Sequence, residues 1–195
     1  EEEIIRPILT RRCKTPCING WMEYQHRLPT KEEVTNWFTQ NPSANIAIIT
    51  GAVSKLVVFD LDSDHAIQYA EDEGGFPDTV KVKTGKGYHV YMRHPGFEIK
   101  NSVNKNLDID IRADGGYVAA PPSLHGSGHT YEWVEGFSIF QIDPADCSPW
   151  MMDYLKDIAS SSVTDEKQAA LNKEFSETIH LDEQVIQAAA EVRTK

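Results

Sequence analysis

The chain has 195 residues, of which 40% are hydrophobic, and its formal net charge at pH 7 is −11. This length is enough for one sizeable core, whereas three cysteines are too few for a disulfide framework and fit a reducing compartment. No apolar run approaches the length of a membrane span, and no signal-peptide pattern opens the chain. We therefore expect a cytoplasmic globular protein, and the absence of an initial Met suggests a fragment of a longer one.

Charge is distributed unevenly along the chain. Between Lys81 and Arg112, seven Lys and Arg residues stand against three Asp and Glu residues, a local excess of +4. The total of −11 argues against extensive binding to duplex DNA. A local basic patch on an acidic body instead suits a phosphate-bearing ligand. Arg11, Arg12 and Lys14 form a second, smaller basic cluster.

Hydrophobic periodicity and turn residues predict short strands and helices up to residue 158. Scattered apolar positions in residues 1–29 predict mostly loop. Thr30 and Glu33 form a capping-box pattern, which opens a helix that ends near Gln40. Strands are predicted at 45–50, 56–62, 79–84, 88–93, 107–112, 116–120 and 129–134, and further helices at 65–73 and 150–158.

The pattern divides the chain into a body and a tail. Residues 1–159 carry all the predicted strands, and we expect them to form one domain. Residues 160–164 are rich in serine and are interpreted as a linker. Helices predicted at 166–179 and 183–192 make residues 160–195 a linker followed by a helical tail.

Two aspartates end the most strand-like run of the chain, Leu56-Val-Val-Phe-Asp-Leu-Asp62. Side chains at i and i+2 leave the same face of a strand, so Asp60 and Asp62 point together. Like charges this close stay ionised only beside a cation, and oxygen ligands favour Mg²⁺ or Mn²⁺. The alternative is a strand end whose aspartates cap the next helix, which Ser63-Asp64 would open.

A third acidic candidate lies on the predicted strand 107–112. Asp108 and Asp110 alternate with apolar residues and share a face with Arg112. If this strand lay beside the first aspartate strand, three carboxylates would surround a pair of metal ions, as two-metal phosphoryl transfer requires. The alternative is an edge strand with a solvated polar face.

The turn Thr84-Gly-Lys-Gly-Tyr-His89 supplies groups for an anion. Its glycines expose backbone N–H groups, and the Lys86 ammonium and Thr84 hydroxyl can reach phosphate oxygens. The spacing is not that of a Walker A loop. His89 follows on the next strand and could face the same cleft, although a single histidine on a strand is more often structural.

A zinc site is weakly indicated. The pairs Cys13/Cys17 and His125/His129 have ligand-like spacing, but they lie far apart in the sequence. No second cysteine pair exists, so we expect no zinc finger.

The order of these motifs resembles a known family. An apolar strand ending in Asp-x-Asp, a glycine-rich turn followed by His, and a further strand with Asp resemble the archaeo-eukaryotic primase superfamily. The resemblance is closer to the bifunctional primase-polymerase (Prim-Pol) domain at the N-terminus of phage and plasmid replication proteins. It implies an α/β (α+β) fold of two abutting α/β modules with mixed sheets around a cleft, plus C-terminal helices. The matching stretches are 14–16, 20–21, 45–51, 57–62, 83–89, 110–118 and 121–123.

The resemblance implies a role for each candidate residue. Asp60, Asp62 and Asp110 match the metal-binding catalytic carboxylates; Asp110 is preferred to Asp108 because the family pattern is Asp-Ile-Arg. His89 matches the histidine that contacts the triphosphate of the incoming nucleotide. The other matches are nucleotide-binding positions: Thr84, Gly85, Lys86 and Arg112 for phosphates, and Asn45 and Gly51 for the pocket.

The implied activity is template-directed nucleotidyl transfer by a DNA polymerase, a DNA primase or both. The implied ligands are two Mg²⁺ or Mn²⁺ ions, a dNTP or NTP, and a single-stranded DNA template with its primer. A helicase region usually follows in such proteins, and residues 160–195 would be the truncated start of a helix-bundle region. The expected setting is the cytoplasm of a host cell, with a phage or plasmid as the source.

Other functions are also compatible with parts of the sequence. A replication protein could keep the fold as a non-catalytic module that binds template or nucleotide. A haloacid-dehalogenase-like phosphatase would use Asp60 as nucleophile and Asp62 as acid and base. Its motif is usually followed by Gly-Thr or Gly-Val, where this chain has Ser63-Asp64, and no late acidic pair is evident. A sugar-nucleotide transferase with an Asp-x-Asp motif has no other support.

Overall fold

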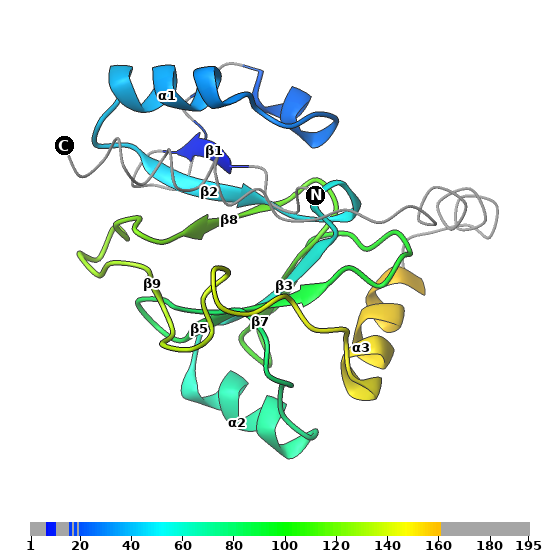
Figure 1. The fold of residues 1–195 in the computed structure, drawn as a ribbon. Coiled ribbons are helices and arrows are strands. Elements are labelled where there is room, and N and C mark those ends of the chain that lie inside the picture. The colour runs from blue at the N-terminus through cyan, green and yellow to red at the C-terminus, as the bar shows by residue number, and fades with distance from the viewer. Residues whose placement is uncertain (1–6, 11–15, 17, 19, 161–195) are drawn as a thin grey trace.

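Two β-sheets form the framework of the protein in this computed structural model, which describes residues 7–10, 16, 18 and 20–160 (Figure 1). The smaller sheet has the order β1-β2-β8 and the larger one β6-β7-β3-β5-β4-β9. The strands are β1 (Pro7–Thr10), β2 (Asn45–Ile49), β3 (Leu56–Leu61), β4 (Lys81–Lys83), β5 (Tyr88–Arg93), β6 (Ser102–Asn104), β7 (Ile109–Arg112), β8 (Tyr117–Ala120) and β9 (Glu132–Trp133).

The sheets are antiparallel, whereas the family resemblance implied mixed sheets. Every pairing between named strands is antiparallel. Parallel pairing is confined to two isolated bridges among the described residues, Met92 with Ala145 and Lys100 with Asp114. The prediction of an α+β fold is confirmed, but its two sheets are antiparallel and not mixed.

Helices cover the outer face of each sheet (Figure 1). Helix α1 (Lys31–Gln40) lies over the smaller sheet, and α2 (Asp64–Asp72) and α3 (Pro149–Ser160) lie beneath the larger one. Two short 3₁₀ helices, η1 (Trp21–Gln25) and η2 (Ala52–Ser54), complete the described elements. None of these helices is long and apolar enough to cross a membrane.

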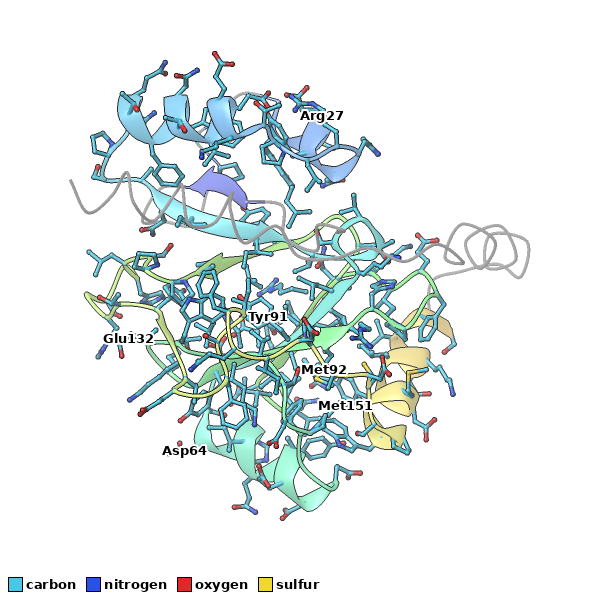
Figure 2. All side chains as sticks on the ribbon, viewed as in Figure 1. Arg27, Asp64, Tyr91, Met92, Glu132 and Met151 are labelled. Carbon is cyan, nitrogen blue, oxygen red and sulfur yellow. The ribbon has the colours of Figure 1, made fainter. Side chains whose placement is uncertain are left out.

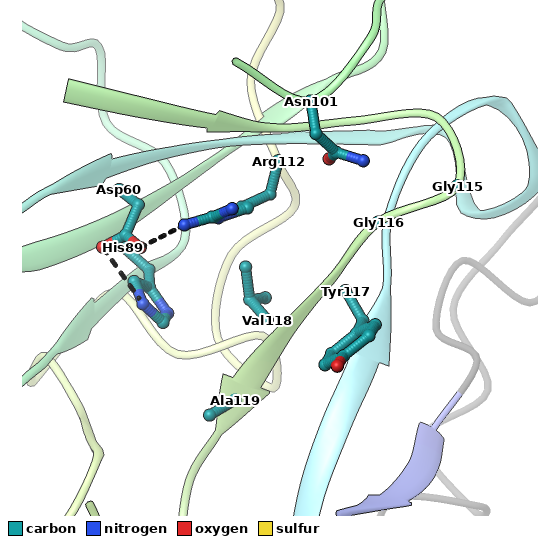
Figure 3. A pocket seen from close by; sticks show the side chains of 9 residues that line it. All are labelled: Asp60, His89, Asn101, Arg112, Gly115, Gly116, Tyr117, Val118 and Ala119. Carbon is teal, nitrogen blue, oxygen red and sulfur yellow. Dashed lines mark ion pairs between the residues drawn. The ribbon is translucent and has the colours of Figure 1, made fainter. Parts of the chain in front are cut away.

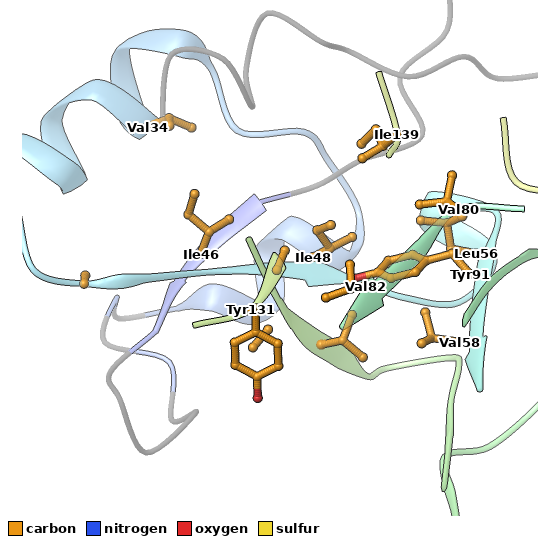
Figure 4. Packing of buried hydrophobic residues seen from close by; sticks show 14 of the residues in the cluster. Val34, Ile46, Ile48, Leu56, Val58, Val80, Val82, Tyr91, Tyr131 and Ile139 are labelled. Atoms are coloured by element: carbon orange, nitrogen blue, oxygen red, sulfur yellow. The ribbon is translucent and has the colours of Figure 1, made fainter. Parts of the chain in front are cut away.

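Strand β3 separates two hydrophobic cores. Its residues alternate, so Val57 and Phe59 pack with α2 and α3, whereas Leu56 and Val58 pack between the two sheets. In the core between the sheets, β2 supplies Ile46 and Ile48 (Figure 4). The next residue with the parity of Leu56 and Val58 is Asp60, which therefore faces the space between the sheets.

The same alternation continues on β5. Tyr91 belongs to the core between the sheets, whereas Met92 belongs to the core under the larger sheet, with Met151 of α3 (Figure 2). His89 lies two residues before Tyr91 on the same strand, so its side chain projects from the same face, toward the smaller sheet. Alternation along two neighbouring strands thus places Asp60 and His89 on one face.

Several local predictions are confirmed. Thr30 Oγ1 accepts a hydrogen bond from Glu33 N, and Thr30 N donates to Glu33 Oε2, which is the complete capping box. The hairpin around residues 85–87 joins β4 to β5. Ser63 caps α2 by accepting a hydrogen bond from Ala66 N. The alternative in which Asp60 and Asp62 cap this helix is therefore wrong, because a serine holds the cap position.

Other predictions need correction. The strand predicted at 107–112 begins only at Ile109, because Asp108 adopts a φ of 53° that no strand continues through. The edge strand β6 was not predicted; its central residue Val103 is 58% exposed, so it carries no burial pattern. Helix α3 reaches Ser160, and the predicted tail helices at 166–179 and 183–192 lie outside the described residues.

Candidate active site

The candidate site lies at the middle of the larger sheet. In the β3 ladders, Asp60 is directly paired with His89 of β5 on one side and with Asp110 of β7 on the other. Side chains of directly opposite residues project from the same face of a sheet. Three polar side chains therefore stand in a row across the face that looks toward the smaller sheet.

Three carboxylates converge at this row. Asp60, Asp62 and Asp110 each offer an oxygen atom, and these atoms lie within 4.8 Å of one another. Asp60 is 4% exposed, Asp110 is half-buried, and Asp62 is exposed just beyond the end of β3. The donors are all oxygen, which fits hard cations such as Mg²⁺ and Mn²⁺. The three aspartates could therefore hold metal ions.

Asp108 has a different place from its predicted neighbour Asp110. It lies in the turn before β7, and its carbonyl oxygen accepts a hydrogen bond of 3.0 Å from Asp62 N. This backbone contact fixes the start of the segment that follows β3. Asp108 thus supports the position of Asp62 without joining the carboxylate group.

Arg112 is the cationic partner of the carboxylates. Its Nη2 lies 2.5 Å from Oδ2 of Asp110 and 3.9 Å from Oδ2 of Asp60. A guanidinium held at two carboxylates lowers their mutual repulsion. The sequence predicted a cation at this point, and the structure places an arginine of the same strand there.

His89 is buried against Asp60. It is 2% exposed, and its Nε2 lies 3.3 Å from Oδ1 of Asp60. Its Nδ1 is also buried and has no hydrogen-bond partner among the described residues. A buried polar atom without a hydrogen-bond partner lowers stability by about 1–3 kcal/mol. Such an atom can mark a site where a bound ligand supplies the missing hydrogen bond.

A cavity of about 320 Å³ connects these residues to the smaller sheet (Figure 3). The charged wall of the cavity belongs to the larger sheet and consists of Asp60, His89 and Arg112. The remaining lining comes mainly from β8 and the turn before it, together with Asn101, which directly precedes β6. These residues are Asn101, Gly115, Gly116, Tyr117, Val118 and Ala119. The cavity therefore has one charged wall, and the rest of its lining carries no charged side chain.

The predicted phosphate-binding turn borders the end of β3. Thr84 Oγ1 accepts hydrogen bonds from Lys86 N at 3.2 Å and Gly87 N at 3.0 Å, so two of the predicted backbone donors are already used. A Cβ on Gly87 would overlap the carbonyl oxygen of Leu61. The turn thus packs directly on β3, but Thr84, Gly85 and Lys86 do not line the cavity.

The two residues predicted for the nucleotide pocket also lie outside the cavity lining. Asn45 is buried and exchanges two hydrogen bonds with the backbone of Leu124, at 2.8 and 2.9 Å. Gly51 has a φ of 94°, and a Cβ there would lie 2.5 Å from Cα of Asp114. The structure gives Asn45 and Gly51 packing roles around the site.

Sequence reasoning gave no role to Asp114, a half-buried carboxylate next to the cavity. Asp114 accepts hydrogen bonds from Ala52 N at 2.7 Å and Ile99 N at 2.8 Å, and lies 3.3 Å from Nε2 of His94. Burial raises the pKa of Asp114, but these hydrogen bonds outweigh it and lower the pKa below its ordinary value. The Asp-Gly-Gly sequence signals only a turn; the partners of the carboxylate are distant in sequence.

The structure describes only the histidine pair of the zinc candidates. His125 lies 2.6 Å from Ser127 Oγ through its Nδ1, in a turn with His129. Cys13 and Cys17 fall outside the described residues. Within the described ranges, the group that could hold a metal is the carboxylate group alone.

Fold and site together define an α+β protein in which three carboxylates, centred on strand β3, could hold hard cations beside a histidine and an arginine. The chain matches the family described as bifunctional DNA primase/polymerase, N-terminal, over residues 6–150. This match spans most of the chain, and the chain belongs to that family. A search of curated proteins gave no match. The resemblance drawn from the motifs is confirmed, and the phosphatase alternative loses its basis.

Proposed function

We propose that this domain catalyses template-directed nucleotidyl transfer, as a DNA polymerase, a DNA primase or both. The observation that carries the proposal is the convergence of Asp60, Asp62 and Asp110, of which Asp60 lines the cavity together with Arg112 and His89. The family is described by primase and polymerase activity, and this arrangement supplies the groups that such a reaction needs.

Asp60, Asp62 and Asp110 would hold two Mg²⁺ or Mn²⁺ ions. Such ions lower the pKa of an attacking hydroxyl and neutralise charge on the phosphates. The half-buried and exposed positions of Asp110 and Asp62 leave room for a substrate oxygen and for water. Asp60 pairs with Asp110 across the ladder and lies two residues from Asp62 in the chain, so it would be the central carboxylate of the group.

The reaction joins a primer to an incoming dNTP or NTP. The primer 3′-hydroxyl oxygen bonds to the α-phosphorus, the bond from that phosphorus to the β-phosphate bridge breaks, and pyrophosphate leaves; the hydroxyl proton passes to solvent. Arg112 can exchange its contact with Asp110 for phosphate oxygens, because its guanidinium offers further N–H donors. His89 has Nδ1 available as the second contact.

Lys86 would act from the rim of the site. It lies in the turn that packs on the end of β3, next to Asp62. From there its ammonium can attract the terminal phosphates without entering the cavity. Thr84 holds the turn closed through its hydroxyl and thereby fixes the approach of Lys86.

We propose further that the partners are single-stranded DNA template and primer, in phage or plasmid replication together with a helicase region. Family membership is the support for these partners and for a cytoplasmic setting. The domain boundary proposed at residue 159 falls at the last turn of α3.

Extension of a labelled primer on a single-stranded template tests the proposal. The reaction contains dNTPs and Mg²⁺ or Mn²⁺, and the protein is compared with Asp62→Asn, which alters an exposed ligand and leaves the core untouched. Asp153→Asn, at an exposed aspartate of α3, is the matched control. We expect extension by the wild type and the control, and loss of about 100-fold or more in Asp62→Asn.

Two outcomes would redirect the proposal. Equal extension by Asp62→Asn would remove the carboxylates from the mechanism. No extension by any protein, with dNTP still bound in a calorimetric titration, would favour the non-catalytic nucleotide-binding module.

A further inference from the structure

The segment between β8 and β9 joins the two sheets at the site. Ser123 Oγ donates to Ile46 O and accepts from Ile46 N, both at 2.9 Å. The next residue, Leu124, exchanges two hydrogen bonds with the Asn45 side chain. The start of the segment is therefore fixed to β2 of the smaller sheet by four hydrogen bonds, each between a side chain, Ser123 or Asn45, and a backbone atom.

The segment then returns to the larger sheet at Tyr131. Tyr131 N donates to Ser123 O at 2.8 Å, so its backbone position follows that of the anchored residue. Its side chain is 2% exposed, and its ring centroid lies 5.5 Å from that of His89, with 36° between the planes. An aromatic ring from a segment held by the smaller sheet thus packs on the histidine of the larger sheet.

The orientation of His89 decides which nitrogen meets a ligand. With Nε2 at Asp60, only Nδ1 remains for a substrate. The contact to Asp60 is 3.3 Å long and leaves the ring able to rotate about its terminal torsion. Packing must fix that torsion, and Tyr131 is nearer to the ring than Tyr91, whose centroid lies 6.4 Å away.

A second contact keeps Tyr131 in place. The ring of His125 meets Tyr131 edge-on, at 5.9 Å and 74°. His125 Nδ1 and Ser127 Oγ would lie 3.5 and 3.3 Å from a Cβ on Gly85. The segment therefore also packs against the turn that carries Lys86, and the ring of Tyr131 contacts both His89 and His125.

We infer that Tyr131 is a positioning residue, which holds the imidazole of His89 in the orientation that presents Nδ1 to the phosphates of the incoming nucleotide. This inference rests on the proposed function for the identity of the ligand. It assigns Asn45 as the anchor that carries the position of β2 to Tyr131 through Leu124. It also explains why Asn45, although outside the cavity, belongs to the site.

Three variants test the inference in primer extension. Tyr131→Leu removes the ring, Tyr131→Phe keeps it, and Trp133→Leu is the matched control, since Trp133 packs on Tyr91 and Phe140 instead of His89. We expect Tyr131→Leu to raise the KM for dNTP about tenfold, because a misplaced binding group loses its contact. Its kcat should change by less than about twofold, and Tyr131→Phe should match the wild type.

A second measurement does not depend on activity. In ¹⁵N-histidine NMR spectra of the full chain without nucleotide, the two ring nitrogens of His89 report which one carries the proton. We expect the wild type and Tyr131→Phe to share one pattern, and Tyr131→Leu to show an averaged one. Equilibrium unfolding in denaturant confirms that each variant is folded.

The outcomes separate this inference from the proposed function. Unchanged KM and an unchanged His89 pattern in Tyr131→Leu would overturn the inference, as would an equal KM increase in Trp133→Leu or a defect in Tyr131→Phe. A wild type that neither binds dNTP nor extends a primer would overturn the proposed function, and the NMR comparison would still decide whether Tyr131 orients His89.

Discussion

Arg112 and Asp110 share one face of β7, two residues apart, and their side chains form an ion pair beside the cavity that Arg112 lines. The same guanidinium lies 3.9 Å from Asp60. One guanidinium therefore offsets part of the negative charge of the three carboxylates. A metal ion held by these carboxylates would compete with Arg112 for the charge of Asp60 and Asp110.

This competition makes Arg112→Gln informative. Without metal, the variant should be less stable than the wild type by about 1–3 kcal/mol, because Asp60 and Asp110 lose their cation. Mg²⁺ or Mn²⁺ should raise the melting temperature of the variant more than that of the wild type, since a ligand that binds the folded state stabilises it by mass action. Melting with and without EDTA measures both effects. Equal metal-induced shifts would show that Arg112 and the ion do not compete.

The two glycines of the 85–87 turn should respond differently to alanine. Gly87→Ala forces a Cβ against the carbonyl oxygen of Leu61, so we expect a loss of about 1–3 kcal/mol in unfolding free energy. Primer extension should fall with it, because the turn packs beside Asp62. The tightest contact of a Cβ at Gly85 is the movable Ser127 hydroxyl at 3.3 Å, so Gly85→Ala should cost less than about 1 kcal/mol. Equal losses in the two variants would mean that contact with β3 is not what Gly87 provides.

Asp114→Asn tests the half-buried carboxylate next to the cavity. An amide has one oxygen, so it cannot accept from both Ala52 N and Ile99 N in the present geometry. We expect a loss of about 1–3 kcal/mol at pH 7. The folded-state pKa is lowered, so this stabilisation is fully present above about pH 3.8 and declines below it. Denaturant unfolding from pH 7 to pH 3 should show a constant difference that begins to shrink below pH 3.8.

Glu33 should contribute to acid sensitivity at the other end of the molecule. A hydrogen bond from Arg27 lowers the pKa of Glu33 to about 2, against the opposing effect of burial. Its stabilisation is therefore present above pH 4.5 and is lost as the pH falls toward 2. Glu33→Gln should cost about 1 kcal/mol at pH 7, the upper range for a partly exposed pair. A difference that stays constant down to pH 3 would contradict the assignment.

Local rules predicted much of the site from the sequence. The i, i+2 rule placed Asp60 and Asp62 together, and alternation placed Asp110 and Arg112 on one face. These relationships depend only on neighbours in the chain. The capping box at Thr30 and the hairpin at residues 85–87 were predictable for the same reason.

Contacts between distant residues were not predictable from one sequence. Gly51 approaches Asp114, and Asn45 binds Leu124, only because two sheets pack against each other. Tyr131 meets His89 through a segment whose path depends on that packing. Periodicity indicates which residues face a core, but it does not say which residue lies opposite.

The hydrophobic core between the sheets has a consequence for substrate size. One wall of the cavity belongs to the larger sheet and the other to β8 of the smaller sheet. The apolar side chains packed between the sheets, among them Ile48 and Val58, act as a spacer that sets the width of the cavity. The size of nucleotide that fits is thus partly determined by residues that never touch it, and a methyl group added to this spacer is a means of changing selectivity from a distance.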